Sequence, residues 1–264
     1  MKKLAFALTM LFVLFNSCIA EEFYLHHREI FSIELKTGAA VDFHSIDYEH
    51  LFTDEKSSNF NTKNQLFPLI HFNASYALTK KLQSSLAFAF NKSKALFQAD
   101  NYFFTRDEDF SELKKVITKE HFDYSFDIYS LSAGISYEIF PELINGPLKL
   151  NAEIFSAFFS NEFLNYEEIM EPENSVFLID GKTTRTRILG KGESKDLRKQ
   201  SFGLSFSLEH YLKVARNMFF TQTLAYSQQL QSLSKNFDWH LNGISFVLGL
   251  RYSLIKEMAS PLEP

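Results

Sequence analysis

Several features are scarce in this chain of 264 residues, which holds one cysteine, one tryptophan, 9 glycines and 6 prolines. A single cysteine excludes a disulfide-stabilised scaffold, and the few glycines and prolines exclude collagen-like repeats and low-complexity disorder. No run of about 18 consecutive apolar residues occurs, which excludes a helical membrane span. The formal net charge of −5 shows no excess of positive charge, so we expect no nucleic-acid partner.

Aromatic side chains, by contrast, are abundant. The chain has 30 phenylalanines and 11 tyrosines, and so many large apolar side chains exclude intrinsic disorder. The mean hydropathy is nevertheless only −0.14. The aromatic residues must therefore be spaced among polar ones, and their spacing carries the structural information.

The first twenty residues have the pattern of a secretory signal peptide. A basic start (residues 1–3) precedes an apolar stretch (residues 4–15), and small residues come before a cleavage point after Ala20. Residues 1–20 are thus predicted to be removed, which leaves 21–28 as a short periplasmic segment. Lipidation of Cys18 is an alternative reading of the same segment.

The body of the chain alternates between apolar and polar residues with a period of two. A helical period of 3.6 fits none of these stretches, whereas a β-strand fits all of them. Tyr124, Phe126 and Ile128 are out of phase with Leu131 and its successors, so we expect a bulge near residues 129–130. The eight patterned stretches are residues 33–43, 70–78, 86–90, 131–139, 148–158, 202–208, 220–226 and 244–254.

The two faces of these strands differ in chemistry. One face consists of Phe, Leu, Ile and Tyr with almost no charge, as expected against lipid, while the other is rich in Ser, Gly, Ala, Asn and Thr, as expected around a narrow lumen. We expect one aromatic girdle from Tyr76, Tyr137, Tyr211 and Tyr252, with Trp239 in the opposite girdle. The pattern predicts strands that cross a membrane.

Short and long connections alternate along the chain. The long ones are residues 46–66, 95–123, 160–200 and 229–241, which is typical of a barrel with extracellular loops and periplasmic termini. The fold class predicted is therefore all-β, an antiparallel up-and-down transmembrane β-barrel of eight strands over residues 29–255, followed by a polar tail (256–264). An even strand number leaves no open edge in lipid.

Two loops suggest structure of their own. Residues 175–179 and 183–187 flank Asp180-Gly181, a strong hairpin signal. We expect this hairpin to stand above the membrane, although its inclusion in the barrel would raise the count to ten strands. In the second loop, Phe110, Leu113 and Val116 have helical spacing and predict a short surface helix.

This architecture resembles the small bacterial outer-membrane β-barrels, the group of OmpA-like, OmpX-like and OmpW-like proteins. The resemblance rests on strand count, connection lengths and face chemistry over residues 29–255, not on a motif. It implies an integral outer-membrane protein in contact with lipid and lipopolysaccharide, inserted by the barrel assembly machinery and expected to be monomeric. Such barrels commonly end on an aromatic residue, whereas here a polar tail follows Tyr252.

Charged residues at inward-facing positions are the first candidate site. An eight-stranded barrel is just wide enough to be filled by its side chains, so such charges must pair. We expect Glu138 to face Lys149, and Glu34 to face Arg251. The simplest interpretation is a structural plug, and the alternative is a gated conduit. The predicted lumen residues are Glu34, Lys36, Asp42, His71, Asp127, Glu138, Lys149, Glu153, Glu209 and Arg251.

The third long loop is the second candidate site, because acidic residues in its first half precede a basic half. The simplest interpretation is a solvated surface, whereas a functional one has the basic half bind lipopolysaccharide phosphates or another polyanion. The basic residues are Lys182, Arg185, Arg187, Lys191, Lys195, Arg198 and Lys199.

Two short spacings resemble those of an enzyme family. Asp107-x-Asp109 and Asp238-x-His240 are similar to the acidic and Asp-x-His pairs of the omptin proteases, but the similarity ends with these four residues. We therefore predict no catalytic residue, no metal site and no cofactor. The function expected is adhesion or surface binding through the loops, with passage of small solutes as the alternative and hydrolysis as a distant third.

Overall fold

The computed structural model describes residues 27–46, 65–106, 113–141, 146–171, 176–179, 182–193, 197–235 and 238–257. These residues form β-strands and their connections, and no helix among them is long and apolar enough to cross a membrane. The strands are β1 (His27–Ile46), β2 (Leu66–Ala77), β3 (Leu82–Arg106), β4 (Leu113–Phe140), β5 (Leu148–Met170), β6 (Phe177–Ile179), β7 (Lys182–Thr184), β8 (Thr186–Gly192), β9 (Gln200–Ala215), β10 (Met218–Gln229) and β11 (Trp239–Glu257).

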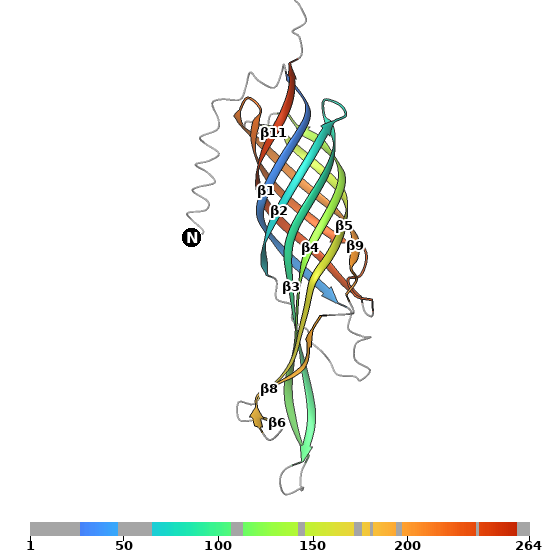
Figure 1. Cartoon of the computed structure of the whole chain (residues 1–264), viewed down its shortest axis with the longest axis vertical. Coiled ribbons are helices and arrows are strands. Elements are labelled where there is room, and N and C mark those ends of the chain that lie inside the picture. Colours follow the sequence, from blue (N-terminus) through green and yellow to red (C-terminus); the bar gives the residue numbers. More distant parts are fainter. Residues whose placement is uncertain are drawn as a thin grey trace, which may run out of the picture.

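Eight of these strands close into a ring (Figure 1). The order is β4-β3-β2-β1-β11-β10-β9-β5, and pairing of β4 with β5 completes the circle. Each of the eight patterned stretches falls in a different one of these strands, apart from residue 78 just after β2, so the predicted antiparallel eight-stranded barrel is confirmed. β6 and β7 form a separate two-stranded sheet, which confirms the predicted hairpin outside the barrel wall.

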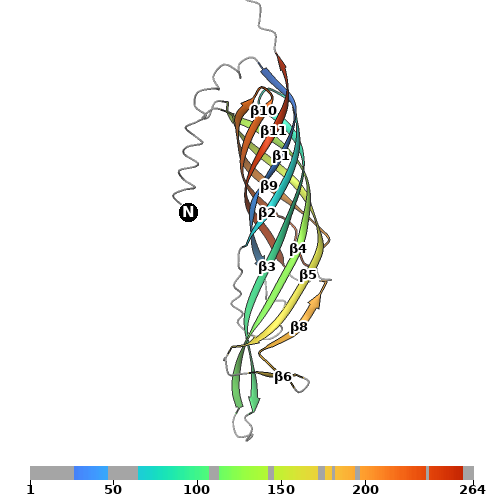
Figure 2. The same cartoon turned by 60° about the vertical axis from the view of Figure 1, so that its left-hand side comes forward.

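The strands differ greatly in length. We call the end where β1 begins and β11 finishes the proximal end, and the opposite end the distal end. β3, β4 and β5 have 25, 28 and 23 residues, against 12 in β2 and 12 in β10. The three long strands continue past the distal end of the ring, where β8 joins the free edge of β5 (Figures 1 and 2). We call this extension of β3, β4, β5 and β8 the distal sheet.

The distal sheet corrects two expectations. The segment predicted as a loop over 95–123 is mostly a β-hairpin, in which β3 pairs with β4 up to Arg106 and Leu113. No surface helix forms over the described residues from 113 onward, because Val116 is buried and its neighbour Ile117 is 46% exposed, as in a strand. Cross-strand pairing with β3 satisfies the backbone of this segment, and tertiary pairing has overridden the apparent helical spacing.

The predicted bulge near residues 129–130 is also wrong. β4 keeps one phase across residues 124–131, so that Tyr124, Phe126 and Ile128 point to the inside together with Ser130. The irregularity lies on β5. Ser125 pairs with Phe163 and Asp127 pairs with Ser160, so between these pairs one residue of β4 stands opposite two residues of β5. Asn161, with a φ of 52°, belongs to this bulge, and asparagine tolerates the left-handed region better than most residues.

The outer surface of the ring is apolar, as the alternation predicts. Side chains such as Leu86 (67% exposed), Ile154 (64%) and Leu35 (59%) face outward from three different strands. A belt of this kind is unstable in water and stable in lipid. Two girdle residues are exceptions: Tyr211 is 3% exposed and Trp239 is not exposed at all, because both side chains are buried within the barrel.

Candidate functional site

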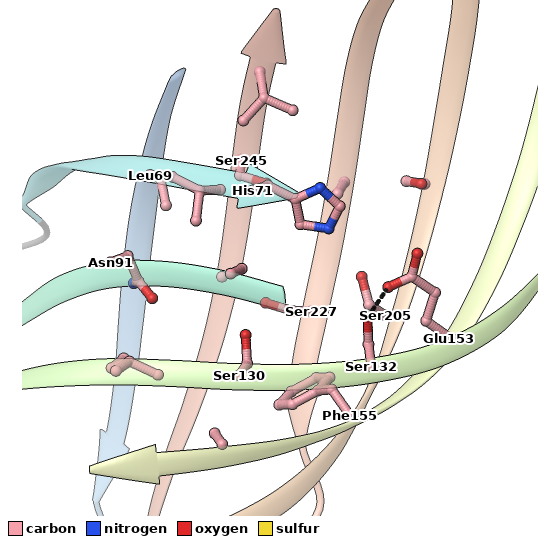
Figure 3. Close-up of a pocket in the computed structure, with 18 of the residues that line it drawn as sticks. Leu69, His71, Asn91, Ser130, Ser132, Glu153, Phe155, Ser205, Ser227 and Ser245 are labelled. Atoms are coloured by element: carbon pink, nitrogen blue, oxygen red, sulfur yellow. Dashed lines mark hydrogen bonds between the residues drawn. The ribbon is translucent and has the colours of Figure 1, made fainter. Parts of the chain in front are cut away.

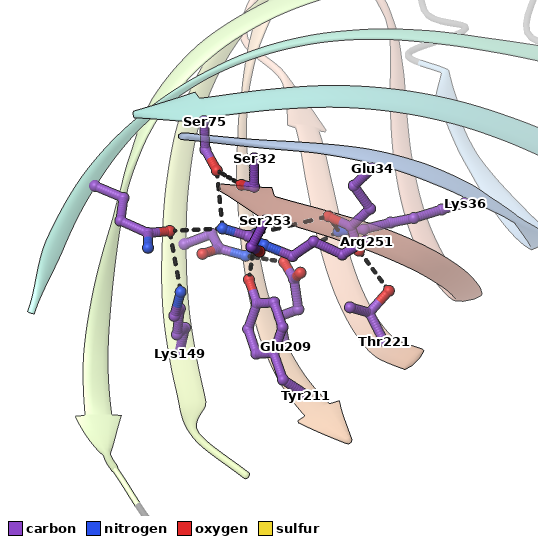
Figure 4. Close-up of polar contacts among 12 residues, drawn as sticks. Ser32, Glu34, Lys36, Ser75, Lys149, Glu209, Tyr211, Thr221, Arg251 and Ser253 are labelled. Atoms are coloured by element: carbon purple, nitrogen blue, oxygen red, sulfur yellow. Dashed lines mark hydrogen bonds and ion pairs between the residues drawn. The ribbon is translucent and has the colours of Figure 1, made fainter. Parts of the chain in front are cut away.

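A network of charged side chains fills the proximal end of the lumen (Figure 4). Arg251 lies at its centre and stands opposite Glu34 in the β1–β11 ladder. Its Nε donates to Glu29 Oε1 at 3.0 Å, and its Nη1 lies 4.0 Å from Glu34 Oε2. Nη1 also donates to the Tyr211 hydroxyl at 2.9 Å, and Nη2 donates to Gln83 Oε1 at 3.1 Å. These partners come from three strands, β1, β3 and β9.

Two lysines complete this network. Lys36 Nζ lies 3.1 Å from Glu34 Oε2 and 3.0 Å from Glu209 Oε2. Lys149 Nζ lies 3.5 Å from Glu29 Oε2. Three cations are therefore matched by three carboxylates, which is the condition under which charges tolerate burial.

Burial shows that the network is a plug. Glu34, Glu209 and Arg251 are each 2% exposed, Lys36 is 3% and Lys149 is 4%. These side chains are almost fully buried, although they lie on the inside of a barrel. We refer to these residues together with Glu29 and Tyr211 as the proximal plug.

Glycine makes room for the plug. A Cβ at Gly249 would lie 2.7 Å from Lys36 Cγ and 2.7 Å from Thr221 Oγ1. Both distances are too short for any side chain, so the lysine can cross β11 only because this position lacks one. Thr221 in turn donates a hydrogen bond to Glu34.

Glu29 is the one plug carboxylate that the alternation does not reveal. The inward positions of β1 have even numbers, such as Ser32 and Glu34, and an odd-numbered residue should point outward. A register irregularity between Glu29 and Phe31 reverses the phase and turns the carboxylate inward. Only the pairing with β11 discloses this bulge.

Most of the other predicted lumen residues also lie inside. Glu138 stands opposite Lys149 in the β4–β5 ladder, but the ammonium of that lysine contacts Glu29 instead. His71, Asp42 and Glu153 lie in the middle of the barrel, beyond the plug.

Asp127 does not belong to the lumen. It lies on the face opposite to Phe126 and Ile128, where its Oδ1 is 3.9 Å from Lys92 Nζ and its Oδ2 accepts a hydrogen bond of 2.6 Å from Asn161. The error follows directly from the misplaced bulge, because reversing the phase of this segment exchanges its two faces.

A chamber of about 160 Å³ occupies the middle of the lumen (Figure 3). Small hydroxylated residues from several strands surround it, including Ser130, Ser132, Ser205, Ser227 and Ser245. The side chains are short, which leaves space where the barrel would otherwise be filled. We call this space the chamber.

An aromatic cluster closes the distal end of the lumen. Trp239, the single tryptophan, is fully buried and has T-shaped contacts with Phe97, Tyr124 and Phe126 at ring-centroid distances of 5.5, 5.0 and 6.0 Å. Its Nε1 donates to His44 Nδ1 at 3.1 Å, so the buried indole is satisfied. We call this group the distal cap.

Two connecting segments complete the cap. Leu197 and Leu233 are 4% and 1% exposed and belong to the same apolar cluster as Trp239. The Arg198 backbone N–H donates to Leu233 O at 2.7 Å, and the Leu233 N–H donates to Trp239 O at 2.7 Å. The cap is therefore part barrel wall and part loop.

The predicted basic run is dispersed over the distal part of the molecule. Arg187 pairs with Glu168 and stacks over Phe177 at 5.0 Å, and Lys199 Nζ lies 3.2 Å from Glu162 Oε1. Other members are satisfied by the backbone: Arg185 Nη2 donates to Met170 O at 3.2 Å, and Arg198 Nε donates to Ser234 O at 3.3 Å. Lys182 and Lys191 are exposed, and Lys195 lies outside the described residues.

The enzyme-like pairs are not brought together by any described contact. Asp107 and Asp109 lie outside the described residues, and Asp238 is exposed immediately before β11. In the described part of the chain, no group of three or more His, Cys, Asp or Glu side chains is arranged to hold a metal ion.

Comparison with known proteins identifies similar folds. No protein-family model matches the chain, and no curated protein matches it. Similar solved structures include Ail, the attachment invasion locus protein of Yersinia pestis, in complex with the heparin analogue sucrose octasulfate (13% identity, 84% of this chain, 99% of that chain, TM-score 0.39). Neisserial surface protein A (11%, 85%, 97%, 0.40) and OprG from Pseudomonas aeruginosa (10%, 86%, 97%, 0.43) are others.

These proteins are small outer-membrane β-barrels, the group that the sequence pattern resembles. At such low identity the similarity concerns the fold alone. The fold assignment for this chain comes from its own strand order and ring closure.

Proposed function

We propose that this protein is an outer-membrane surface-binding protein, in which a closed barrel anchors a recognition surface carried by the distal sheet. The observation that supports this most directly is the contrast between a lumen filled at both ends and three strands that continue far past the apolar belt. In this proposal the proximal end faces the periplasm and the distal end faces the exterior. This is the usual orientation of barrels whose short turns lie at the same end as the chain termini.

The distal sheet has side-chain contacts of its own that support a fixed shape. Val116, Met170 and Phe177 form a small buried cluster, which fastens the β6–β7 hairpin to the sheet. Phe122 and Tyr166 stack across the β4–β5 ladder with ring centroids 4.1 Å apart. A preorganised surface loses less entropy on binding than a mobile loop does.

The surface of β7 and β8 suggests the class of ligand. Lys182, Arg185 and Lys191 are exposed on this segment, which also carries Ile188 and Leu189 with exposures of 59% and 40%. Exposed cations suit an anionic polymer, such as a sulfated polysaccharide or the phosphorylated core of lipopolysaccharide. The proposed ligand is therefore a polyanion.

A conduit is the less favoured function. A solute would have to cross the proximal plug and the distal cap, both of which consist mainly of buried side chains. Insertion by the barrel assembly machinery and a monomeric state remain predictions from the sequence.

Binding of the refolded full-length protein to immobilised heparin tests the proposal. We expect saturable binding that weakens as salt is raised, because exposed ion pairs are screened. The triple variant Lys182→Gln/Arg185→Gln/Lys191→Gln should bind roughly tenfold more weakly, since three exposed ion pairs contribute about 0.5 kcal/mol each.

A matched control removes the same charge at the proximal end. The variant Lys80→Gln/Lys81→Gln/Arg216→Gln changes three exposed residues there and should bind as the unmodified protein does. Absence of binding, salt-independent binding, or equal losses in the two triple variants would contradict the proposal.

A further inference from the structure

The chamber in the middle of the lumen has an unbalanced charge. Each cation of the proximal plug already contacts a plug carboxylate, and this includes Lys36, which also borders the chamber. Asp42 and Glu153 border the chamber as well, but their hydrogen-bond donors are hydroxyl groups. Ser93 donates to Asp42 Oδ2, and Ser132 donates to Glu153 Oε2 at 2.8 Å. The chamber thus contains two carboxylates that no described salt bridge neutralises.

These two carboxylates come from opposite walls. Asp42 lies on β1 and Glu153 on β5, and three strands separate β1 from β5 in either direction around the ring. Inward side chains of these two strands enter the lumen from opposite walls. The negative charge is therefore placed at two sides of the chamber rather than in one cluster.

Unpartnered polar atoms give a second, independent indication of a ligand. Asn151 Oδ1 and Thr223 Oγ1 have no hydrogen-bond partner, although their residues are only 7% and 4% exposed and line the chamber. His71 Nδ1 borders the same space without a partner. A buried polar atom left unsatisfied costs about 1–3 kcal/mol, so a hydrogen-bonding occupant would stabilise the barrel.

The size and the remaining lining of the chamber limit the occupant further. A cavity of about 150 Å³ accommodates a molecule of roughly six heavy atoms such as benzene, and the chamber measures about 160 Å³. Leu69, Ile128 and Phe155 provide apolar contacts between the polar groups. Because the described residues form no metal-binding cluster, an organic cation fits better than a metal ion.

From these observations we infer that the chamber binds a small primary diamine. One ammonium group would contact Asp42 and the other Glu153, while the connecting methylenes would contact the apolar part of the wall. Asn151 Oδ1 and His71 Nδ1 would accept hydrogen bonds from the two ammonium groups, which satisfies atoms that otherwise lack partners. This site is separate from the proposed polyanion surface and does not depend on it.

The test uses radiolabelled 1,4-diaminobutane and the full-length protein. The protein is refolded into detergent micelles with the diamine present, so that entry through the distal cap is not limiting, and free diamine is removed by gel filtration. We expect about one diamine retained per chain. The isosteric double variant Asp42→Asn/Glu153→Gln should retain less than a tenth as much.

A matched control removes two carboxylates outside the lumen. The variant Asp127→Asn/Glu167→Gln should retain the diamine as the unmodified protein does. Folding of every variant is verified by heat-modifiable gel migration. If the chamber variant retains as much diamine as this control, or if the unmodified protein retains none, the inference is wrong.

Competition on the unmodified protein gives an answer even if the chamber variant fails to fold. We expect n-butylamine, with one ammonium group, to compete at least tenfold more weakly than unlabelled diamine. We expect 1,4-butanediol, which has the same length and no charge, not to compete at all. Equal competition by the diol would show that charge plays no part and would overturn the inference.

Discussion

The proximal plug and the distal cap both close the lumen, but they do so with opposite chemistry. The plug is a network of six charged residues with Arg251 at its centre. The cap is an aromatic cluster around Trp239. The plug comes entirely from barrel strands, whereas the cap includes Leu197 and Leu233 from connecting segments.

This difference determines how each closure responds to change. In the plug, loss of one partner leaves a buried charge without compensation, so the damage is large and spreads through the network. In the cap, each apolar side chain contributes separately, and the loop portion can relax around a cavity. We therefore expect single substitutions to be more damaging in the plug than in the cap.

The largest effect is expected at Arg251. Replacement of Arg251 by Ala leaves the buried Glu34 and the partly buried Glu29 beside fewer cations, and we expect the free energy of unfolding to fall by about 3–5 kcal/mol. Equilibrium urea unfolding in lipid vesicles measures this. Lys92→Ala serves as the control, because Lys92 is 63% exposed on the outside and should change stability by less than about 1 kcal/mol. Equal effects of the two substitutions would contradict a buried network.

A smaller effect is expected in the cap. Leu233→Ala removes a side chain that is 1% exposed, and the free energy of unfolding should fall by about 2–3 kcal/mol, near the lower limit for a buried leucine because a loop carries it. The single tryptophan gives a second measurement: its fluorescence should shift toward longer wavelength as water reaches the cluster. Leu230→Ala, on a side chain that is 58% exposed nearby, should leave that emission unchanged.

Replacement of a glycine by alanine tests how tightly the plug is packed compared with the distal sheet. Gly249→Ala places a methyl group within 2.8 Å of Leu35 O and 2.7 Å of Lys36 Cγ, and we expect it to destabilise the protein by about 1–3 kcal/mol. Gly190→Ala on β8 meets nothing closer than 3.8 Å and should be neutral within about 0.5 kcal/mol. Similar midpoints for the two variants in urea unfolding would mean that the plug is loosely arranged.

The smallest effect is expected at Asp127. Since this carboxylate lies outside the lumen and pairs with an exposed lysine, Asp127→Ala should lower the free energy of unfolding by less than about 1 kcal/mol. A loss comparable to that of Arg251→Ala would indicate that Asp127 belongs to the lumen network, as the sequence alone predicts.

The comparison of sequence with structure shows which features alternation can predict. The eight strands and the inward direction of Glu34, Lys36, Lys149, Glu209 and Arg251 follow from the period of two, because one face of each strand contacts lipid and the other does not. The cap was not predictable in this way. Tyr124, Phe126 and Ile128 look like lipid-facing residues, because the sequence does not show whether an apolar side chain contacts lipid or an apolar interior.

Bulges limit the prediction further. One bulge assigned to β4 instead of β5 reversed the faces of a whole segment and misplaced Asp127, and an unrecognised bulge hid Glu29. A bulge depends on the pairing of two strands distant in sequence, so a single strand does not reveal it. The distal sheet was missed for the same reason: its stability comes from the β3–β4 ladder and not from local spacing.

Single-channel conductance of the refolded, unmodified protein in planar lipid bilayers tests most directly whether the lumen is closed at both ends. With the plug and the cap in place, we expect no discrete conductance steps at any ionic strength, and Leu233→Ala alone should not produce them because the plug still closes the proximal end. Regular, long-lived conductance steps from the unmodified protein would contradict a closed barrel and would favour the conduit.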